Sequence, residues 1–195
     1  NFGVEIDFLM TLYLTPSMSP STIYGAAEAG ITGVKFYPRG VTTNSNEGLD
    51  NIESLYPVFM AMEETGIVLE IHSELQSDHA KNICILNAEE YFLPKVEQLH
   101  KDFPRLRIVL EHVTSAATVS LVKRLGCSVA ATITAHHLDL TVDDWAGKNH
   151  NFCKPVAKYP RDRDALRAVI KEGHPRFFLG SDSAPHQIGK KECAV

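Results

Sequence analysis

Several features that mark particular classes of protein are missing from this sequence of 195 residues. Its longest apolar runs have the length of a β-strand, so we expect no membrane-spanning segment. No charged start followed by an apolar core and a small-residue cleavage site is present, so we expect no signal peptide. Basic residues form no run, and the formal net charge is -5, so we expect no nucleic-acid partner.

Paired cysteines and nucleotide-binding loops are missing as well. Cys84, Cys127, Cys153 and Cys193 form no CxxC pair, so neither a cysteine zinc knuckle nor a disulfide framework is indicated. A reducing, cytoplasmic setting is therefore expected. No GxGxxG motif or P-loop follows the first strand-like segment, which disfavours a nucleotide-binding fold.

What the sequence does contain is a regular alternation of strand-sized apolar segments with segments of helical periodicity. Ser19 and Pro20 indicate a helix start, and Gly66 indicates a helix end. This pattern predicts parallel strands in a sheet that is covered on both faces. The expected strands are 8–14, 33–37, 67–72, 108–113, 128–134 and 176–182. The expected helices are 20–30, 49–65, 88–101, one that ends at Leu125 after a cap at Thr114 or Ser115, and 161–173.

Two architectures fit this alternation, an open doubly wound sheet and a closed eight-stranded barrel. A complete barrel typically needs about 250 residues, and this chain is shorter. The stretch 39–48 is polar, contains glycine and is longer than a tight connection. Such stretches are often lids or binding loops.

Lys35 stands inside one of the expected strands, between Val34 and Phe36. Burial disfavours the ammonium form of lysine and lowers its pKa. A neutral amine can form a Schiff base or take up carbon dioxide to become a carbamate. The alternative is that the Lys35 side chain extends past the strand end into water.

Four expected strands carry a residue that can bind metal at or near their C-terminal ends. In parallel α/β folds this edge is where the active site forms. Two imidazoles, a carboxylate and a carbamylated lysine would suit zinc, and a carbamate could bridge two ions about 3.5–4 Å apart. We interpret the nearby Glu70 and Glu111 as solvated or supporting carboxylates. The four residues are Lys35, His72, His112 and Asp182.

Several motifs together resemble a known family. These are GVKFYPRGVTTNS, the strand ending in His72, LEHVTS, AATITAHHL, NFCKPVAK and FLGSDSAPH. In this order, they resemble the shorter bacterial and fungal dihydroorotases of the amidohydrolase superfamily. The resemblance covers nearly the whole chain and implies a (β/α)8 barrel of the TIM type. Residues 1–195 would be a single barrel domain that is incomplete at both ends and contains about strands three to eight.

The resemblance also implies a reaction and a cofactor. Two zinc ions would be bridged by N6-carboxylated Lys35, with His72 and His112 on the more exposed ion. Asp182 would bind the buried ion and transfer the catalytic proton. The implied reaction is the reversible cyclisation of N-carbamoyl-L-aspartate to L-dihydroorotate in pyrimidine synthesis, with a bridging hydroxide as the nucleophile in hydrolysis.

Further residues match positions that contact the substrate in the family. Thr42 and Thr43 match a mobile lid whose hydroxyls donate to the substrate, and His186 matches a residue that contacts the substrate's carboxylate. Lys154 matches a position whose backbone contacts the pyrimidine ring. The resemblance implies no ligand role for the histidines at 136–137. It allows a homodimer.

The sequence departs from the family in three respects, because it lacks the first strand, the second strand with a substrate-binding asparagine, and the segment beyond the last strand. The His-x-His-x-Arg strand that would begin the barrel is missing, so the buried ion would lack its imidazole ligands and the activity of these 195 residues stays open. Two alternatives remain, namely another binuclear cyclic amidohydrolase (a hydantoinase or dihydropyrimidinase) and a catalytically inactive scaffold module. The Thr42–Thr43 pair and SDSAPH disfavour the first, and retention of all four strand-end residues disfavours the second.

Overall fold

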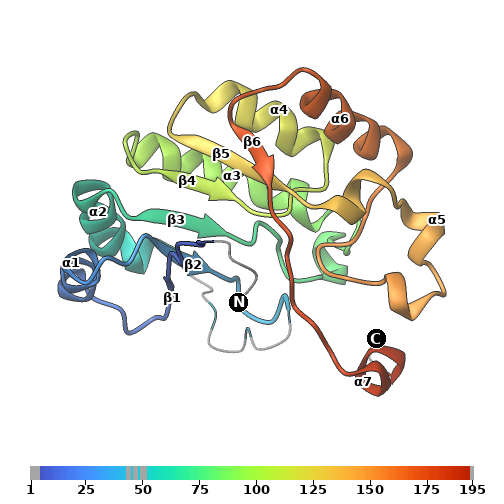
Figure 1. Ribbon diagram of the computed structural model, residues 1–195, viewed down its shortest axis with the longest axis horizontal. Helices are drawn as coiled ribbons and strands as arrows, with labels where there is room; N and C mark the ends of the chain where they lie inside the picture. The colour runs from blue at the N-terminus through green and yellow to red at the C-terminus, as the bar shows by residue number, and fades with distance from the viewer. Residues whose placement is uncertain (1–4, 43–44, 46–47, 49–51, 194–195) are drawn as a thin grey trace.

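The computed structural model describes residues 5–42, 45, 48 and 52–193. Within these ranges, six strands form one parallel sheet, and each strand lies beside its neighbour in the sequence (Figure 1). This order is that of a run of consecutive strand–helix units. The strands are β1 (Thr11–Tyr13), β2 (Gly33–Phe36), β3 (Val68–Ile71), β4 (Ile108–Leu110), β5 (Val129–Ile133) and β6 (Phe177–Leu179).

Helices connect the strands, as the periodicity predicted. The α-helices are α1 (Pro20–Glu28), α2 (Tyr56–Thr65), α3 (Ala88–Asp102), α4 (Ala116–Leu125), α5 (Val142–Trp145), α6 (Pro160–Lys171) and α7 (Ile188–Cys193). The 3-10 helices are η1 (Glu53–Leu55), η2 (His79–Lys81), η3 (Ala135–Leu138) and η4 (Asn149–Asn151). The short α5 and the terminal α7 were not predicted, and α7 lies at the end of an extended segment that leaves β6 (Figure 1).

The predicted helix boundaries have local causes. Ser19 caps α1 by accepting a hydrogen bond from the backbone N–H of Thr22, and Pro20 occupies the first helical position. Helix α2 ends at Gly66, whose φ of 75° lies in the left-handed region that favours glycine. The helix expected over 49–65 begins later, with η1 and then α2. Residues 49–51 lie outside the described ranges.

The core lies between the sheet and its helices. Alternate strand residues such as Val34, Leu69 and Leu110 are fully buried in one cluster with residues of α1 to α4 and α6. Successive crossovers of the same hand place these helices on one face of the sheet. Residues at the intervening positions, such as Glu70 and Ala130, are only partly buried. The prediction that both faces are covered is therefore wrong, because the described helices cover one face.

The two edge strands are shorter and more exposed than predicted. Only Thr11–Tyr13 of the expected strand 8–14 pairs with a neighbour, and the side chain of Phe8 is 82% exposed. The described residues before β1, 5–10, are all exposed. At the other edge, Leu179 of β6 is 74% exposed. An open parallel sheet with apolar residues at both edges corresponds to part of a barrel whose closure these strands do not provide.

Two further findings concern the whole described chain. All four cysteines are free thiols. No helix among the described residues has both the length and the apolar character needed to cross a bilayer.

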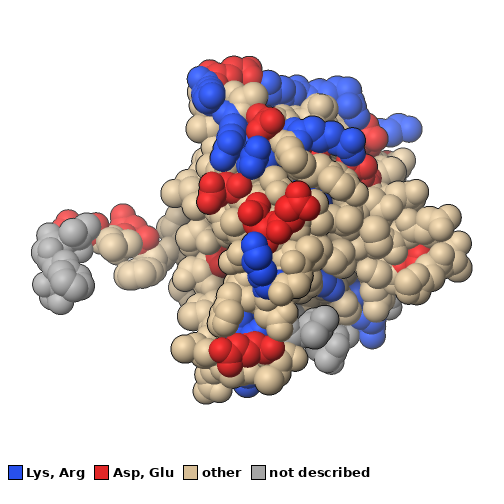
Figure 2. Space-filling view, turned by 90° about the vertical axis from the view of Figure 1, so that its right-hand side faces the viewer, with Lys and Arg blue, Asp and Glu red and all other residues tan. Residues whose placement is uncertain are grey.

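The face of the molecule in Figure 2 carries acidic and basic side chains interspersed rather than a patch of one sign.

Candidate active site

The structure places the four predicted strand-end residues along one edge of the sheet. Lys35 lies in β2, His72 directly follows β3, and His112 lies two residues beyond β4. Because the strands are parallel, these positions face the same end of the sheet. The rings of His72 and His112 approach to 4.7 Å between centroids, and Asp182 follows β6 at the same end.

Lys35 does not extend freely into water. Its side chain is 12% exposed, and its ammonium group forms an ion pair with the carboxylate of Glu111. The ammonium also lies 5.1 Å from the centroid of the Tyr37 ring. Glu111 is thus a supporting carboxylate for Lys35, one of the two roles that the sequence suggested for it.

His72 is oriented by a carboxylate that the sequence analysis missed. The His72 Nε2 atom lies 2.8 Å from Oε2 of Glu74, and both side chains are buried. Burial alone would raise the pKa of Glu74, but the hydrogen bond with His72 and the charge of Lys158 hold it below its ordinary value. An ionised carboxylate only accepts hydrogen bonds, so Nε2 donates and Nδ1 remains for another partner.

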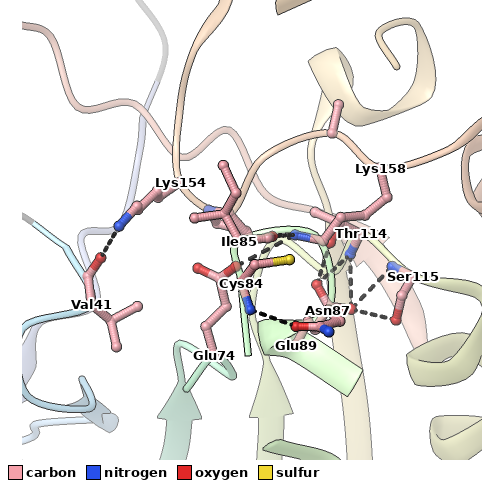
Figure 3. A network of polar contacts seen from close by, with 12 residues as sticks. Val41, Glu74, Cys84, Ile85, Asn87, Glu89, Thr114, Ser115, Lys154 and Lys158 are labelled. Carbon is pink, nitrogen blue, oxygen red and sulfur yellow. Dashed lines mark hydrogen bonds and ion pairs between the residues drawn. The ribbon is translucent and has the colours of Figure 1, made fainter. Parts of the chain in front are cut away.

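The Glu74 carboxylate is in turn held by the buried Lys158. The Lys158 ammonium lies 3.5 Å from Oε1 of Glu74 and donates to the carbonyl of Ile85 at 2.7 Å (Figure 3). Glu74 has a sequence signal that could have revealed it, because side chains two residues apart share one side of an extended chain. Lys158 has none, since it is 84 residues away in the sequence.

His112 has the properties of a neutral imidazole in a constrained position. Burial, reinforced by the nearby positive groups of His72 and Lys35, holds its pKa well below the ordinary value. Its Nδ1 atom is buried and has no hydrogen-bond partner among the described residues. Its backbone adopts a φ of 43° and donates to Oγ1 of Thr132 at 2.6 Å.

Asp182 shares the electrostatic environment of the other three residues. Partial burial raises the pKa of its carboxyl group, while the positive charges of Lys35, His136 and His72 oppose that rise. Its φ is 47°, again in the left-handed region. The residue as a whole is exposed.

We tested this arrangement for its fit to a metal. Among the described residues, no three His, Cys, Asp or Glu side chains are grouped so that they could hold an ion. The donors still fit zinc chemically, because His112 offers an unpartnered buried nitrogen and His72 is oriented by a carboxylate. A carboxylated Lys35 would add an oxygen ligand that the unmodified residue lacks.

The predicted substrate contacts are placed less uniformly. The backbone N–H of Thr42 donates to Oγ of Ser45 at 3.0 Å, whereas Thr43 lies outside the described residues. His186 is exposed on the segment between β6 and α7. The Lys154 ammonium donates to the carbonyl of Val41 at 3.1 Å, so its side chain contacts the loop that carries Thr42 (Figure 3). Their roles toward a substrate remain predictions.

A small cavity opens beside this loop. Its volume is ≈ 190 Å³, and its walls include Val41, Glu74 and Lys154. The loop, the carboxylate that orients His72 and the lysine that contacts the loop therefore border a common space.

Comparison with known proteins gives this edge its context. The dihydroorotase of Mycosarcoma maydis is 57% identical over 184 residues, which cover 94% of this chain and 47% of that protein. The chain is homologous to dihydroorotases over nearly all of its length. No family model matches it. The family predicted from the motifs is thus confirmed, and the chain spans about half the length of the curated relatives that it matches.

Solved structures support the same relationship. Dihydroorotase from Saccharomyces cerevisiae, in complex with 5-fluoroorotic acid, superposes with a TM-score of 0.90 at 49% identity. That match covers 94% of this chain and 54% of the other, and it confirms the prediction of a partial TIM-type barrel. The L-hydantoinase of Arthrobacter aurescens has a TM-score of 0.77 at 20% identity, covering 96% of this chain and 45% of that one, which shows a shared fold.

Proposed function

We propose that the full-length protein is a dihydroorotase, which interconverts L-dihydroorotate and N-carbamoyl-L-aspartate in pyrimidine synthesis. The observation that carries the proposal is the approach of the His72 and His112 rings, whose centroids lie 4.7 Å apart. The rings stand at the C-terminal ends of the strands in a chain homologous to dihydroorotases. Lys35 and Asp182 lie at the same edge. Proteins that share only the fold do not carry this substrate assignment.

Zinc is the proposed cofactor. Carboxylated Lys35, His72 and His112 would hold one ion, and Lys35 with Asp182 would contribute to a second. When bound, zinc would polarise the amide carbonyl and lower the pKa of water. Carboxylation replaces the positive charge of Lys35 with a negative one, so the ion pair with Glu111 exists only in the unmodified state.

The protein's own side chains divide the remaining tasks. Asp182 would accept a proton at its carboxylate and return it to the leaving amide nitrogen, a role that its raised pKa favours. The hydroxyls of Thr42 and Thr43 would donate to the substrate, His186 would bind its carboxylate, and the Lys154 backbone would contact its ring. Glu74 would keep His72 in one orientation.

The proposal extends to the setting of the protein. We place it in the cytoplasm, supported by four free thiols, and assign it no nucleic-acid or membrane partner. Residues 1–195 would form a single barrel domain, incomplete at both ends, that pairs with a second copy in a homodimer.

The test is a substrate profile of the full-length protein purified with zinc and bicarbonate. We expect hydrolysis of L-dihydroorotate and the reverse cyclisation of N-carbamoyl-L-aspartate, with hydantoin and dihydrouracil turned over far more slowly. Faster turnover of hydantoin would identify another cyclic amidohydrolase. A zinc-loaded, folded protein that turns over none of them would support a scaffold module.

Lys35→Ala provides a second test in the same protein. We expect it to abolish the activity, because alanine removes the amine that would carry the proposed carbamate. Lys95→Ala is the matched control, since Lys95 is exposed on α3 away from the site. Full activity in Lys35→Ala would overturn the proposed role of this lysine.

A further inference from the structure

We propose that the Lys154 side chain is a positioning residue that fixes the base of the loop carrying Thr42. The contact itself stands on the structure alone, and its consequence for turnover rests on the function proposed above. The resemblance to the family pointed only to the backbone of this residue. The structure shows its ammonium group donating to the carbonyl of Val41 across 113 residues of sequence (Figure 3).

The base of the loop is a closed hydrogen-bonded turn. Gly40 N–H donates to the Ser45 carbonyl at 3.1 Å, and the Ser45 hydroxyl donates to the Thr42 carbonyl at 2.7 Å. The side chain of Val41 and the whole of Ser45 are buried, with 4% and 1% exposure. The Val41 carbonyl lies within this turn and directs its oxygen to Lys154. A donor there restrains the turn as a unit, next to Thr42.

The segment that supplies Lys154 is itself firmly held. The carbonyl of Pro155 lies 2.9 Å from Nε2 of His137, and the carbonyl of Ala157 accepts from Nε1 of Trp145 at 2.7 Å. Lys158, at the end of this segment, is buried and bonded to the Ile85 carbonyl. Two side chains from other elements, together with the segment's own Lys158 side chain, thus hold residues 155–158 in place. Lys154 directly precedes these restrained residues, so its hydrogen bond to Val41 restrains the loop relative to them.

The contact lies beside the candidate site. Lys154, Val41 and Glu74 line the same ≈ 190 Å³ cavity. Glu74 orients His72, and Val41 precedes Thr42. Lys154 therefore holds the loop proposed to contact the substrate at a cavity that it shares with the carboxylate orienting a proposed metal ligand. A substitution that removes the Lys154 ammonium but keeps an aliphatic side chain should therefore increase the mobility of the loop around Val41 and Thr42. It should leave the contact between Glu74 and His72 unchanged.

The experiment compares Lys154→Met, Lys154→Arg and Lys148→Met in the full-length protein purified with zinc. Lys148 is the matched control because it is exposed on the same connection, six residues earlier. One readout is amide hydrogen exchange at Gly40, Thr42 and Ser45, with helix α3 as an internal reference. The other is the separation of kcat and KM for L-dihydroorotate.

For Lys154→Met we expect faster exchange at the three loop amides, several-fold, with no change in α3. We expect KM to rise about tenfold, on the scale of one charge-assisted hydrogen bond, and kcat to change less than KM. Lys154→Arg should restore much of the loop protection, because arginine retains a donor. Lys148→Met should behave like the unchanged protein.

Two results would overturn the inference. One is unchanged exchange at the loop amides in Lys154→Met; if KM rises all the same, Lys154 contacts the substrate directly. The other is accelerated exchange throughout the chain, α3 included, which would assign Lys154 to global stability. If the unchanged protein does not turn over dihydroorotate, the proposed function fails, and the exchange comparison still decides the positioning role.

Discussion

At the scale of single residues, two positions in the candidate site adopt a backbone conformation that is costly for their residue type. His112 and Asp182 have φ values of 43° and 47°. A non-glycine residue held in the left-handed region costs about 1–3 kcal/mol and persists where the surrounding structure enforces it. Both residues lie just beyond strand ends, where such a turn directs the side chain toward the active-site edge. The strain therefore agrees with a role in function.

The orientation of His72 gives a prediction for Glu74→Gln. Glutamine keeps an oxygen that can accept from Nε2 but removes the charge that pairs with Lys158. We expect the zinc affinity of the full-length protein to fall about 10- to 100-fold, measured by competition with a chelator. Glu90→Gln, at an exposed position of α3, is the control and should leave the affinity unchanged. An unaltered affinity in Glu74→Gln would show that this carboxylate does not support a metal ligand.

His137 gives a prediction for the pH dependence of stability. Burial, followed by the charge of neighbouring His136, lowers its pKa to about 3, while Glu74 opposes and Lys158 reinforces the shift. In the unfolded chain its pKa is about 6.5, so between these values the unfolded state binds a proton that the folded state does not. The stabilisation is complete above pH ~6.5 and decreases as the pH falls toward ~3, by at most about 1.4 kcal/mol per pH unit.

The measurement is the free energy of unfolding in urea between pH 4 and pH 7. His137→Gln retains a donor for the Pro155 carbonyl but cannot titrate, so its stability should depend less steeply on pH than that of the unchanged protein. His79→Gln, at an exposed position of η2, should keep the original slope. Equal slopes in all three proteins would contradict the assignment of the acid sensitivity to His137.

At the scale of elements, helices α3 and α4 are joined by one buried carboxylate. Glu89, 1% exposed in the first turn of α3, accepts from the backbone N–H groups and hydroxyls of Thr114 and Ser115. The Thr118 hydroxyl donates to it as well, at 2.5 Å. These donors lie at the N-terminus of α4, where unpaired N–H groups and the helix dipole favour a negative charge. Two of the donor residues, Thr114 and Ser115, also follow His112 closely in the sequence.

Glu89→Ala should therefore be strongly destabilising. It leaves several buried donors without an acceptor, at about 1–3 kcal/mol each, so we expect a loss of at least about 3 kcal/mol in the free energy of unfolding. Chemical denaturation monitored by circular dichroism measures the loss. Glu90→Ala, at the next and exposed position, should cost less than about 0.5 kcal/mol. A similar small cost for both variants would refute the anchoring role.

At the scale of the whole molecule, the sheet is open and both edges are apolar. Phe8 and Leu9 are exposed before β1, and Phe178 and Leu179 are exposed in β6. Exposed apolar edge strands are sites at which chains pair with other strands. In the proposed metal centre, the lysine and the two imidazoles come from the adjacent strands β2, β3 and β4, whereas Asp182 follows the outermost strand, β6.

For these 195 residues, purified with zinc and bicarbonate, we expect about one zinc ion per chain by elemental analysis. The reason is that Lys35, His72 and His112 form one set of ligands, while a second ion would have only Lys35 and Asp182. His112→Ala should remove the bound zinc, and His79→Ala should retain it. Two ions per chain would show that this edge assembles a complete binuclear site, and none in a folded sample would reject the metal assignment.

The sequence by itself determined the family, the order of strands and helices and the residues at the strand ends. These depend on local signals, namely apolar periodicity, capping residues such as Ser19 and Gly66, and motifs that keep their order. Local signals also fixed the strand positions of Lys35 and His72. They could not show that the ends of the outer strands are unpaired, because pairing depends on a neighbour that no single segment contains.

The tertiary structure alone decided how the site is supported. Lys158 and Glu74 are 84 residues apart, and Lys154 and Val41 are 113 apart, so no periodicity or motif connects them. Whether a lysine is solvated, ion-paired or bonded to a carbonyl depends on which groups folding brings within about 3 Å of it. In this protein the fold pairs Lys35 with Glu111, Lys158 with Glu74 and Lys154 with the carbonyl of Val41.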